Sequence, residues 1–308
     1  MKTVRLKHLG GALLAAAAAC LLAAVGLVVL YAQPAEATFP GKSGKIAYEG
    51  YDGNDYEIYT IKSGGGGKVQ LTDNAMDDAD PCYSPSGKQI VYSGSDGNDD
   101  EIYKINAGGG GKVQLTDNST NDYSPCYSPN GKKIAYSGSD GNDTEIYTIN
   151  AGGGSKFNVT DNSTTDSSPD YSPSGKKIAY SGLDGNDREI YTINAGGGGK
   201  FKVTDNATGD YHPSYSPSGK KIAYSGLDGN DYEIYTINAG GGGKFKVTDN
   251  STNDEWPSYS PSGKKIAYSG QEVANGDYKI YTIKPGGGGK FKVTDNATDN
   301  YGPSWGSS

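Results

Sequence analysis

Residues 169–204 read PDYSPSGKKIAYSGLDGNDREIYTINAGGGGKFKVT, and three turn sequences divide this stretch into four short segments. Pro-Ser-Gly at 173–175, Asp-Gly-Asn-Asp at 184–187 and the glycine run at 196–199 consist of residues that preset or tolerate turn dihedral angles. Between the turns, apolar and polar residues alternate, so that Ile178 and Tyr180 share one face. The stretch therefore predicts four antiparallel strands, at 169–172, 177–181, 189–194 and 200–204.

The same unit recurs six times along the chain. One isoleucine of the second predicted strand returns at a constant spacing of 44 residues, at Ile46, Ile90, Ile134, Ile178, Ile222 and Ile266. An isoleucine of the third strand keeps this spacing up to Ile234, and the next, Ile280, follows after 46 residues. Repeats of this length with four short strands each predict an all-β fold, a six-bladed β-propeller of four-stranded antiparallel blades.

The two ends of the repeat region complement each other. The first unit begins at Lys45 with its second strand, and the chain ends with GPSWG at 302–306, which has the pattern of the missing inner strand. We expect the C-terminal strand to pair with the N-terminal blade, because this closes the ring and removes two open strand edges.

Composition and charge narrow the function classes. A count of Gly 48 and Tyr 25 against Phe 5 fits many tight turns and an aromatic β core. The formal net charge of -8 argues against a nucleic-acid partner, which would require a basic surface. The only histidines are His8 and His212, and the G-x-S-x-G match at 302–306 lacks a following helix and triad partners. We therefore expect no catalytic residue and no enzymatic activity.

Residues 1–37 lie outside the repeat. Three basic residues precede an apolar run at 9–32, and Ala-Glu-Ala at 35–37 has the small-x-small pattern of a cleavage site. This pattern predicts a signal peptide that is removed after Ala37, with an uncleaved membrane anchor as the alternative. In both cases the propeller at 38–308 is expected to be secreted, periplasmic or at the cell surface.

The repeated sequences P-x-Y-S-P-S-G-K-K-I-A-Y-S-G, D-G-N-D-x-E-I-Y-T-I-N-A-G-G and V-T-D-N resemble the WD40-like repeat of the TolB family, also called PD40, over about residues 39–308. Tyrosine replaces the usual inner-strand tryptophan except at Trp305, and Ser-Pro-Ser-Gly or Ser-Pro-Asn-Gly replaces Ser-Pro-Asp-Gly. With residues 1–37 interpreted as a signal peptide or anchor, we expect the chain to lack the α/β domain that precedes the propeller in TolB itself. The resemblance implies the propeller alone, as an extracytoplasmic binding scaffold.

Candidate binding residues lie just before each inner strand, where two positions vary while the framework repeats. These pairs are Ala79-Asp80, Tyr123-Ser124, Ser167-Ser168, Tyr211-His212, Glu255-Trp256 and Tyr301-Gly302. We expect Tyr123, Tyr211, His212, Trp256 and Tyr301 to line one channel mouth, where loops commonly carry function. Aromatic residues with polar tips suit a protein, peptide or glycan partner. The alternative is that these loop positions vary without functional selection and that their aromatic side chains only pack between blades.

Two repeated polar sequences have both a functional and a turn-forming interpretation. The Asp-Gly-Asn-Asp loops group oxygen ligands such as Asp52, Asn54 and Asp55, which calcium requires, although Asp and Asn are also favoured turn formers. Asn-x-Ser/Thr sequences such as the one at Asn118 are glycosylation acceptors or Asx-turns. We expect turns in both cases, with no metal site and no cofactor, and keep calcium as the alternative.

Cys82 and Cys126 occupy equivalent inner-strand positions in neighbouring units. Export would permit a disulfide. Equivalent positions around a channel are, however, expected to exceed the roughly 7 Å limit between the Cα atoms of a disulfide. The sequence therefore predicts two buried or channel-facing thiols.

Three function classes fit these observations. We favour a monomeric, exported binding scaffold over a structural cell-surface repeat protein and over a propeller enzyme or peptidase-associated domain. Because successive antiparallel strands alternate in direction, the aspartate-rich loops should share one face with the candidate mouth, and the lysine-rich turns should share the other. The partner is then expected at an acidic channel mouth, and a membrane contact only through the N-terminal segment.

Overall fold

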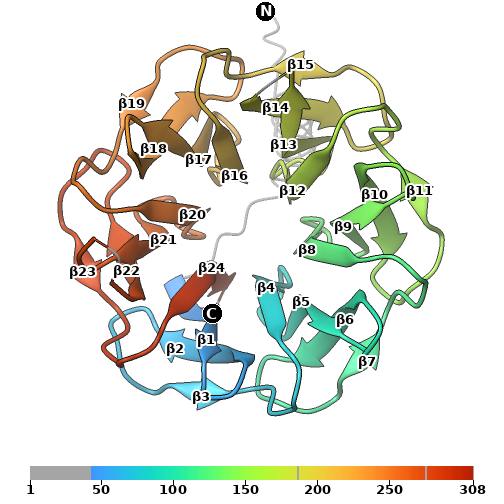
Figure 1. The fold of residues 1–308 in the computed structure, drawn as a ribbon, viewed down its shortest axis with the longest axis horizontal. Helices are drawn as coiled ribbons and strands as arrows, with labels where there is room; N and C mark the ends of the chain where they lie inside the picture. The colour runs from blue at the N-terminus through green and yellow to red at the C-terminus, as the bar shows by residue number, and fades with distance from the viewer. Residues whose placement is uncertain (1–42, 186, 275, 308) are drawn as a thin grey trace, which may run out of the picture. The chain divides into compact units, whose positions relative to one another are not determined.

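The computed structural model describes residues 43–307 except 186 and 275, which form six four-stranded antiparallel sheets arranged in a ring around a channel (Figure 1). The predicted all-β, six-bladed propeller is thereby confirmed. The predicted signal peptide or anchor at 1–37 lies outside the described residues. Within the described part of the chain, no helix has the length and apolar character needed to cross a membrane.

The four strands of each blade are given from the channel outward. Blade 1 consists of β24 (Asn300–Ser307), β1 (Ser43–Tyr51), β2 (Tyr56–Lys62) and β3 (Val69–Gln70). Blade 2 consists of β4 (Asp78–Tyr83), β5 (Gln89–Ser95), β6 (Asp100–Asn106) and β7 (Val113–Gln114). Blade 3 consists of β8 (Asp122–Tyr127), β9 (Lys133–Ser139), β10 (Thr144–Asn150) and β11 (Phe157–Asn158).

The remaining blades follow the same order. Blade 4 consists of β12 (Asp166–Tyr171), β13 (Lys177–Asp184), β14 (Asp187–Asn194) and β15 (Phe201–Lys202). Blade 5 consists of β16 (Asp210–Tyr215), β17 (Lys221–Asp228), β18 (Asp231–Asn238) and β19 (Phe245–Lys246). Blade 6 consists of β20 (Asp254–Tyr259), β21 (Ile266–Gln271), β22 (Tyr278–Ile283) and β23 (Phe291–Lys292).

The C-terminal strand closes the ring as expected. β24 pairs antiparallel with β1, with Ile46 opposite Trp305 and Glu49 opposite Tyr301. Trp305 is buried in the hydrophobic cluster between blades 6 and 1. Closure therefore rests on strand pairing between the two ends of the described chain.

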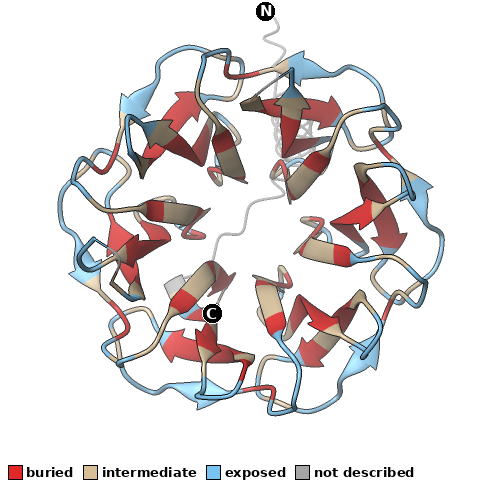
Figure 2. Cartoon of the chain, viewed as in Figure 1, coloured by how far each residue is buried: buried red, intermediate tan, exposed pale blue. Residues whose placement is uncertain are grey.

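Each blade packs against both neighbours, which builds six equivalent hydrophobic clusters. Val91 of blade 2 shares one cluster with Ile134 and Tyr136 of blade 3, and all three are fully buried. The rings of Tyr136 and Tyr147 stack with centroids 5.7 Å apart, and Lys156 Nζ lies 4.1 Å from the Tyr147 centroid. Buried residues are concentrated in the inner three strands of each blade, while the outer strands are exposed (Figure 2). Tyrosine, and not phenylalanine, supplies the buried phenyl rings of these clusters.

Buried carboxyl groups also connect neighbouring blades. Asn118 donates its backbone N–H to Glu101 Oε1 of blade 2 and its side-chain amide to Asp122 Oδ2 of blade 3, the latter at 2.9 Å. Asn118 Oδ1 accepts the N–H of Thr120 at 3.1 Å, which confirms the predicted Asx-turn. Four further junctions repeat this carboxyl arrangement, with Glu57, Asn74 and Asp78; Glu145, Asn162 and Asp166; Glu189, Asn206 and Asp210; and Glu233, Asn250 and Asp254.

The sixth junction, between blades 6 and 1, differs in charge. Lys279 takes the glutamate position and Asn300 the aspartate position. Lys279 is 1% exposed, and its Nζ donates to the Thr298 carbonyl at 3.0 Å and pairs with Asp277 at 3.1 Å. Asp277 thus supplies the counter-charge that a buried lysine requires.

The loops form two sets on opposite faces of the ring. Loops that precede the inner strands contact the loops that join the second and third strands, since Tyr56 donates its N–H to Asp77 Oδ1 at 2.9 Å. Loops that follow the inner strands contact the glycine-rich loops, since Ala107 donates its N–H to the Lys88 carbonyl at 2.9 Å. We call the first, which carries the Asp-Gly-Asn-Asp turns, the acidic face and the second the lysine face. The predicted separation of the two loop sets is confirmed.

Candidate binding site at the channel mouth

A β-bulge at the Xaa-Pro step of each inner strand builds the channel mouth on the acidic face. In blade 5 the register between β16 and β17 jumps from Tyr211 to Ser214, which leaves His212 and Pro213 outside the ladder. Proline is tolerated at such a site because the interrupted ladder needs no N–H there. The residue before each proline has a positive φ, from 51° to 56°, at Asp80, Ser124, Ser168, His212, Trp256 and Gly302.

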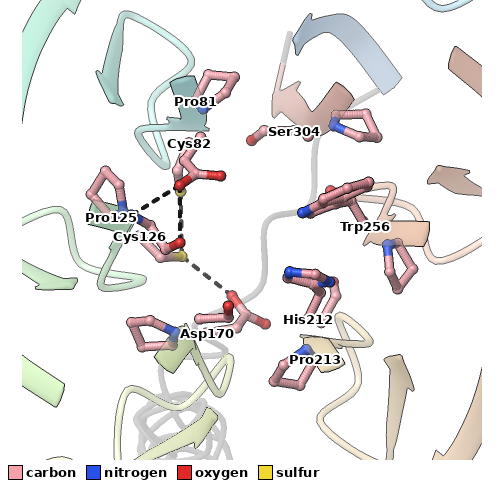
Figure 3. A pocket seen from close by; sticks show the side chains of 18 residues that line it. Pro81, Cys82, Pro125, Cys126, Asp170, His212, Pro213, Trp256 and Ser304 are labelled. Carbon is pink, nitrogen blue, oxygen red and sulfur yellow. Dashed lines mark hydrogen bonds between the residues drawn. The ribbon is translucent and has the colours of Figure 1, made fainter. Parts of the chain in front are cut away.

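Three successive rings of side chains line a channel cavity of about 150 Å³ (Figure 3). The first ring contains the positive-φ residues named above, and the second contains the prolines that follow them. The third ring consists of Cys82, Cys126, Asp170, Ser214, Ser258 and Ser304. A second cavity of about 90 Å³ borders the third ring and continues to the inner-strand tyrosines.

The neighbouring blade holds the backbone of the first ring. His212 donates its N–H to Ser181 Oγ of blade 4 at 3.1 Å, and Trp256 donates its N–H to Ser225 Oγ of blade 5 at 3.1 Å. At blade 1, Glu49 replaces this serine, and its Oε2 accepts the N–H of Asp80 at 3.0 Å. Because the anchor is a backbone group, the side chains of the first ring can vary without loss of this contact.

Aromatic side chains from blades 5, 6 and 1 form a continuous series along one half of the mouth. The ring centroids of His212 and Trp256 are 4.9 Å apart, and those of Trp256 and Tyr301 are 5.3 Å apart. Tyr211 lies 6.1 Å from His212, and Tyr278 lies 4.8 Å from Tyr301. We call these five residues the aromatic arc. His212 and Trp256 reach the channel cavity itself.

Carboxyl groups also lie at the mouth, in blades 1, 2 and 4. Ser124 donates its N–H and its hydroxyl to Asp80 Oδ2, at 3.1 and 3.0 Å. Burial and the nearby Asp80 raise the pKa of Glu49 to about 8, and burial raises the pKa of Asp170 to about 6. Burial also lowers the pKa of His212 to about 4, so the imidazole is neutral at pH 7. The mouth thus combines the aromatic arc with carboxyl groups, of which Glu49 is mainly protonated at pH 7.

A second variable position of the repeat meets the first on the acidic face. It is the residue that follows the Asp-Gly-Asn-Asp turn. In blade 4, Arg188 Nη1 donates to Ser167 Oγ at 3.1 Å. In blade 6, Tyr278 Oη donates to Glu255 Oε1 at 3.2 Å. Sequence reasoning missed this pairing, although the shared variability of the two positions was a usable signal.

The structure brings together four of the five residues predicted to form the site. Tyr211, His212, Trp256 and Tyr301 belong to the aromatic arc. Tyr123 lies in blade 3, where its hydroxyl donates to Thr144 Oγ1 at 3.3 Å beside a separate cavity of about 550 Å³. Tyr123 is therefore not part of the arc. Asp80, Asp170 and Glu49 are mouth residues that the sequence analysis did not single out.

The Asp-Gly-Asn-Asp loops use their first aspartate as a turn former. Asp52 Oδ1 accepts the backbone N–H of Asn54 at 2.8 Å and that of Asp55 at 3.3 Å. Among residues 43–307 without 186 and 275, no group of three His, Cys, Asp or Glu side chains is placed to hold a metal ion. The expected absence of a metal, and calcium binding at these loops as its alternative, both stay predictions.

The two cysteines are free thiols that face the channel, as predicted. The sequence analysis considered only the Cα atoms of these two residues and did not anticipate contact between their sulfur atoms. Cys82 Sγ and Cys126 Sγ are 3.3 Å apart, because the six inner strands converge on a narrow channel.

The fold and the cavity at the channel mouth define the class of this chain: it is a six-bladed β-propeller with a candidate binding site at one end of its central channel. The PD40 family model, described as the TolB beta propeller domain, matches residues 113–308. This match covers more than half of the sequence, and the chain belongs to the TolB β-propeller family. A comparison with curated proteins finds no match.

Solved structures share the fold at low sequence identity. TolB from Acinetobacter baumannii is 22% identical with a TM-score of 0.77, over 85% of this chain and 66% of that chain, so this chain spans just under two thirds of that protein. A chain of a nidogen/laminin complex is 9% identical with a TM-score of 0.70, over 85% of this chain and 98% of that chain. Oligogalacturonate lyase in complex with manganese is 15% identical with a TM-score of 0.56, over 82% and 74%. Such distant likeness extends to the fold alone.

Proposed function

We propose that this chain is an exported, non-enzymatic TolB-like scaffold whose channel mouth on the acidic face binds an extended segment of a protein partner. The aromatic arc carries this proposal. Three neighbouring blades contribute aromatic side chains, each of which contacts the next. In blades 4, 5 and 6, a serine hydroxyl of the preceding blade accepts the backbone N–H at the equivalent position. Tyr and Trp in such clusters are the residues that most often dominate binding energy at protein interfaces.

Backbone conformation supports a functional reason for the arc. Trp256 and His212 both have φ of 52°, a region in which side chains other than glycine cost roughly 1 kcal/mol. Gly302 occupies the equivalent position in blade 1, with φ of 54°. Stability alone would favour glycine there, so a bulky ring at a strained position is better explained by binding.

The chemistry of the mouth favours a basic or apolar segment. The aromatic arc offers faces for apolar side chains and for a cation, and Asp80 and Asp170 offer negative charge across the channel. The Asp-Gly-Asn-Asp loops of blades 1 to 3 would attract a cationic partner from a distance, whereas in blades 4 to 6 lysines such as Lys246 pair with the carboxylates of the corresponding loops. A glycan is the alternative ligand, and it would use the same aromatic faces without the dependence on salt concentration.

Blade 4 supplies the matched control for a binding experiment. Its first variable pair is Ser167-Ser168, and Ser168 has φ of 56°. Replacing Tyr211-His212 or Glu255-Trp256 by Ser-Ser therefore introduces the residues that blade 4 already has at these positions, and both variants should fold. We expect each double variant to lose capture of an envelope partner by about tenfold or more, as expected for interface hot spots.

Capture would be measured by affinity isolation from an envelope fraction, with bound proteins identified by mass and bound glycans by sugar analysis. A Lys176→Ser variant on the lysine face serves as the surface control. If the Ser-Ser variants and Lys176→Ser retain the same partner equally, the mouth is not the binding site, and a structural surface role fits better.

A further inference from the structure

The third channel ring differs between the two halves of the propeller. Blades 5, 6 and 1 contribute Ser214, Ser258 and Ser304. Blades 2, 3 and 4 contribute Cys82, Cys126 and Asp170 at the equivalent positions. The three residues that replace serine lie in adjacent blades. Each of the first two side chains contacts the next one around the ring. The thiol of Cys82 donates to Cys126 Sγ at 3.3 Å, and the thiol of Cys126 donates to Asp170 Oδ1 at 3.3 Å (Figure 3).

We propose that Cys82 and Cys126 form a reversible disulfide that joins blades 2 and 3 across the channel wall. A disulfide bond is about 2.05 Å long, so the two sulfur atoms must approach by only about 1.2 Å. Both residues are half-buried and line the cavity, which gives a small oxidant access. The formation of the disulfide in the cell rests on the proposed export, because exported proteins meet an oxidising environment.

The reaction is a thiol–disulfide exchange with a small-molecule or protein disulfide, RSSR. The thiolate of Cys82 attacks one sulfur of RSSR, which forms a mixed disulfide and expels one RS⁻. Cys126 then loses its proton to the Asp170 carboxylate and attacks Cys82 Sγ, which closes the Cys82–Cys126 bond and expels the second RS⁻. The two RS⁻ groups take up the two protons, so two protein thiols are oxidised and one external disulfide is reduced.

The contacts of the two thiols favour Cys82 as the first nucleophile. Cys82 Sγ accepts the backbone N–H of Tyr127 at 3.4 Å, an interaction that strengthens when the sulfur is ionised. Cys126 instead faces the carboxylate of Asp170, which disfavours a second negative charge. The hydrogen bond with Cys82, followed by burial, raises the pKa of the Cys126 thiol. Cys126 therefore suits the resolving role.

The cross-link would join β4 and β8 at the channel, on the side of the cavity that lies across from His212 and Trp256 of the aromatic arc (Figure 3). Cys82 and Cys126 are 44 residues apart in the sequence. Tying two points of that separation together restricts the unfolded chain and should stabilise the ring.

The experiment uses the full chain with Cys20→Ser, which leaves Cys82 and Cys126 as the only cysteines. The protein is incubated with oxidised glutathione, unfolded in the presence of an alkylating reagent, and analysed by mass and by peptide mapping. We expect a monomer that takes up no alkyl groups and yields a peptide pair linked through Cys82 and Cys126. Reductant should restore two alkylation sites, and the oxidised form should melt about 5 °C higher or more.

Serine is the matched replacement, because it fills this ring in three blades. Cys126→Ser should stop at a mixed disulfide, with one glutathione on Cys82, and its melting temperature should no longer respond to the oxidant. Two fully alkylable thiols after prolonged incubation of the folded Cys20→Ser protein, or disulfides found only between molecules, would overturn the proposal. Neither result depends on whether the mouth binds a partner.

Discussion

The walls, by which we mean the hydrophobic interfaces between neighbouring blades, keep the same residues from repeat to repeat, whereas the residues at the mouth of the channel vary. At the walls, Ile90, Ile134 and Ile222 recur at equivalent, fully buried positions in their clusters. At the mouth, equivalent backbone positions carry residues as different as Asp80 and Trp256, although both have φ of 52°. The difference indicates that the walls hold the ring together, while the mouth side chains are free to be selected for binding. Changes at the walls should therefore affect stability, and changes at the mouth should affect recognition.

The largest expected effect tests the wall at the closure point. Deletion of residues 302–308 removes most of the pairing of β24 with β1, including the pair of Ile46 with the buried Trp305. We expect a loss of about 5 kcal/mol or more, comparable with the whole stability of many domains. Thermal unfolding followed by circular dichroism would measure it, and a truncated chain that melts like the full chain would contradict closure by strand pairing.

A single methyl group should test the wall at a regular junction. A Cβ added at Gly138 would lie 2.6 Å from Asp122 Oδ1 and 3.1 Å from the rings of Tyr136 and Tyr147. We expect Gly138→Ala to destabilise the fold by about 1–3 kcal/mol through overpacking. Gly152→Ala is the matched control, since a Cβ there meets no atom within 4 Å. Equal denaturation midpoints for the two variants would show that the junction is looser than the contacts indicate.

The carboxyl junctions should make stability fall as the pH rises. Burial raises the pKa of Asp122 and Asp166 to about 6, and that of Asp210 and Asp254 to about 7, from 3.8. A carboxyl with a raised pKa in the folded chain contributes stability that is complete below the unfolded pKa and is lost as the pH passes the folded pKa. His212 acts in the opposite sense, because its pKa falls from 6.5 to about 4, and a comparison between pH 6 and pH 8.5 leaves out most of that contribution.

We expect the melting temperature to fall by about 5 °C over this range at constant ionic strength. The junction between blades 6 and 1 supplies the control, because Asn300 occupies its aspartate position. Asp122→Asn copies that residue and should make the pH dependence less steep. A melting temperature that rises from pH 6 to pH 8.5 would rule out protonated carboxyls at the junctions.

The sequence predicted the parts of the structure that depend on local order along one repeat. The turns at 173–175 and 196–199 delimit the strands, and GPSWG at 302–306 is recognisable as the missing inner strand. Contacts between blades were not predictable in the same way. The 3.3 Å separation of Cys82 and Cys126 depends on how narrowly the inner strands converge, which the repeat does not encode. The bulge at His212 was also missed, because Xaa-Pro marks an interrupted ladder without specifying a positive φ.

The smallest effect on stability is expected at the mouth. Trp256→Gly removes a ring from the aromatic arc but relieves a positive φ of 52°. Because these changes oppose each other, we expect the free energy of unfolding to change by no more than about 1 kcal/mol. Chemical denaturation would measure the change. A loss of several kcal/mol would mean that the arc is part of the structural framework, and the distinction between wall and mouth would fail.

The fluorescence of Trp256 during partner binding tests the central claim most directly. The chain has Trp 2 in total, and Trp305→Tyr would leave Trp256 as the single tryptophan, which can be excited at wavelengths where tyrosine does not absorb. Tyrosine fills the position equivalent to Trp305 in the other blades, as Tyr83 and Tyr127 do, so this variant should fold. Titration with the captured partner should shift or quench the Trp256 emission and reach saturation at the affinity measured independently. Saturating binding without any change in that emission would contradict recognition at the aromatic arc.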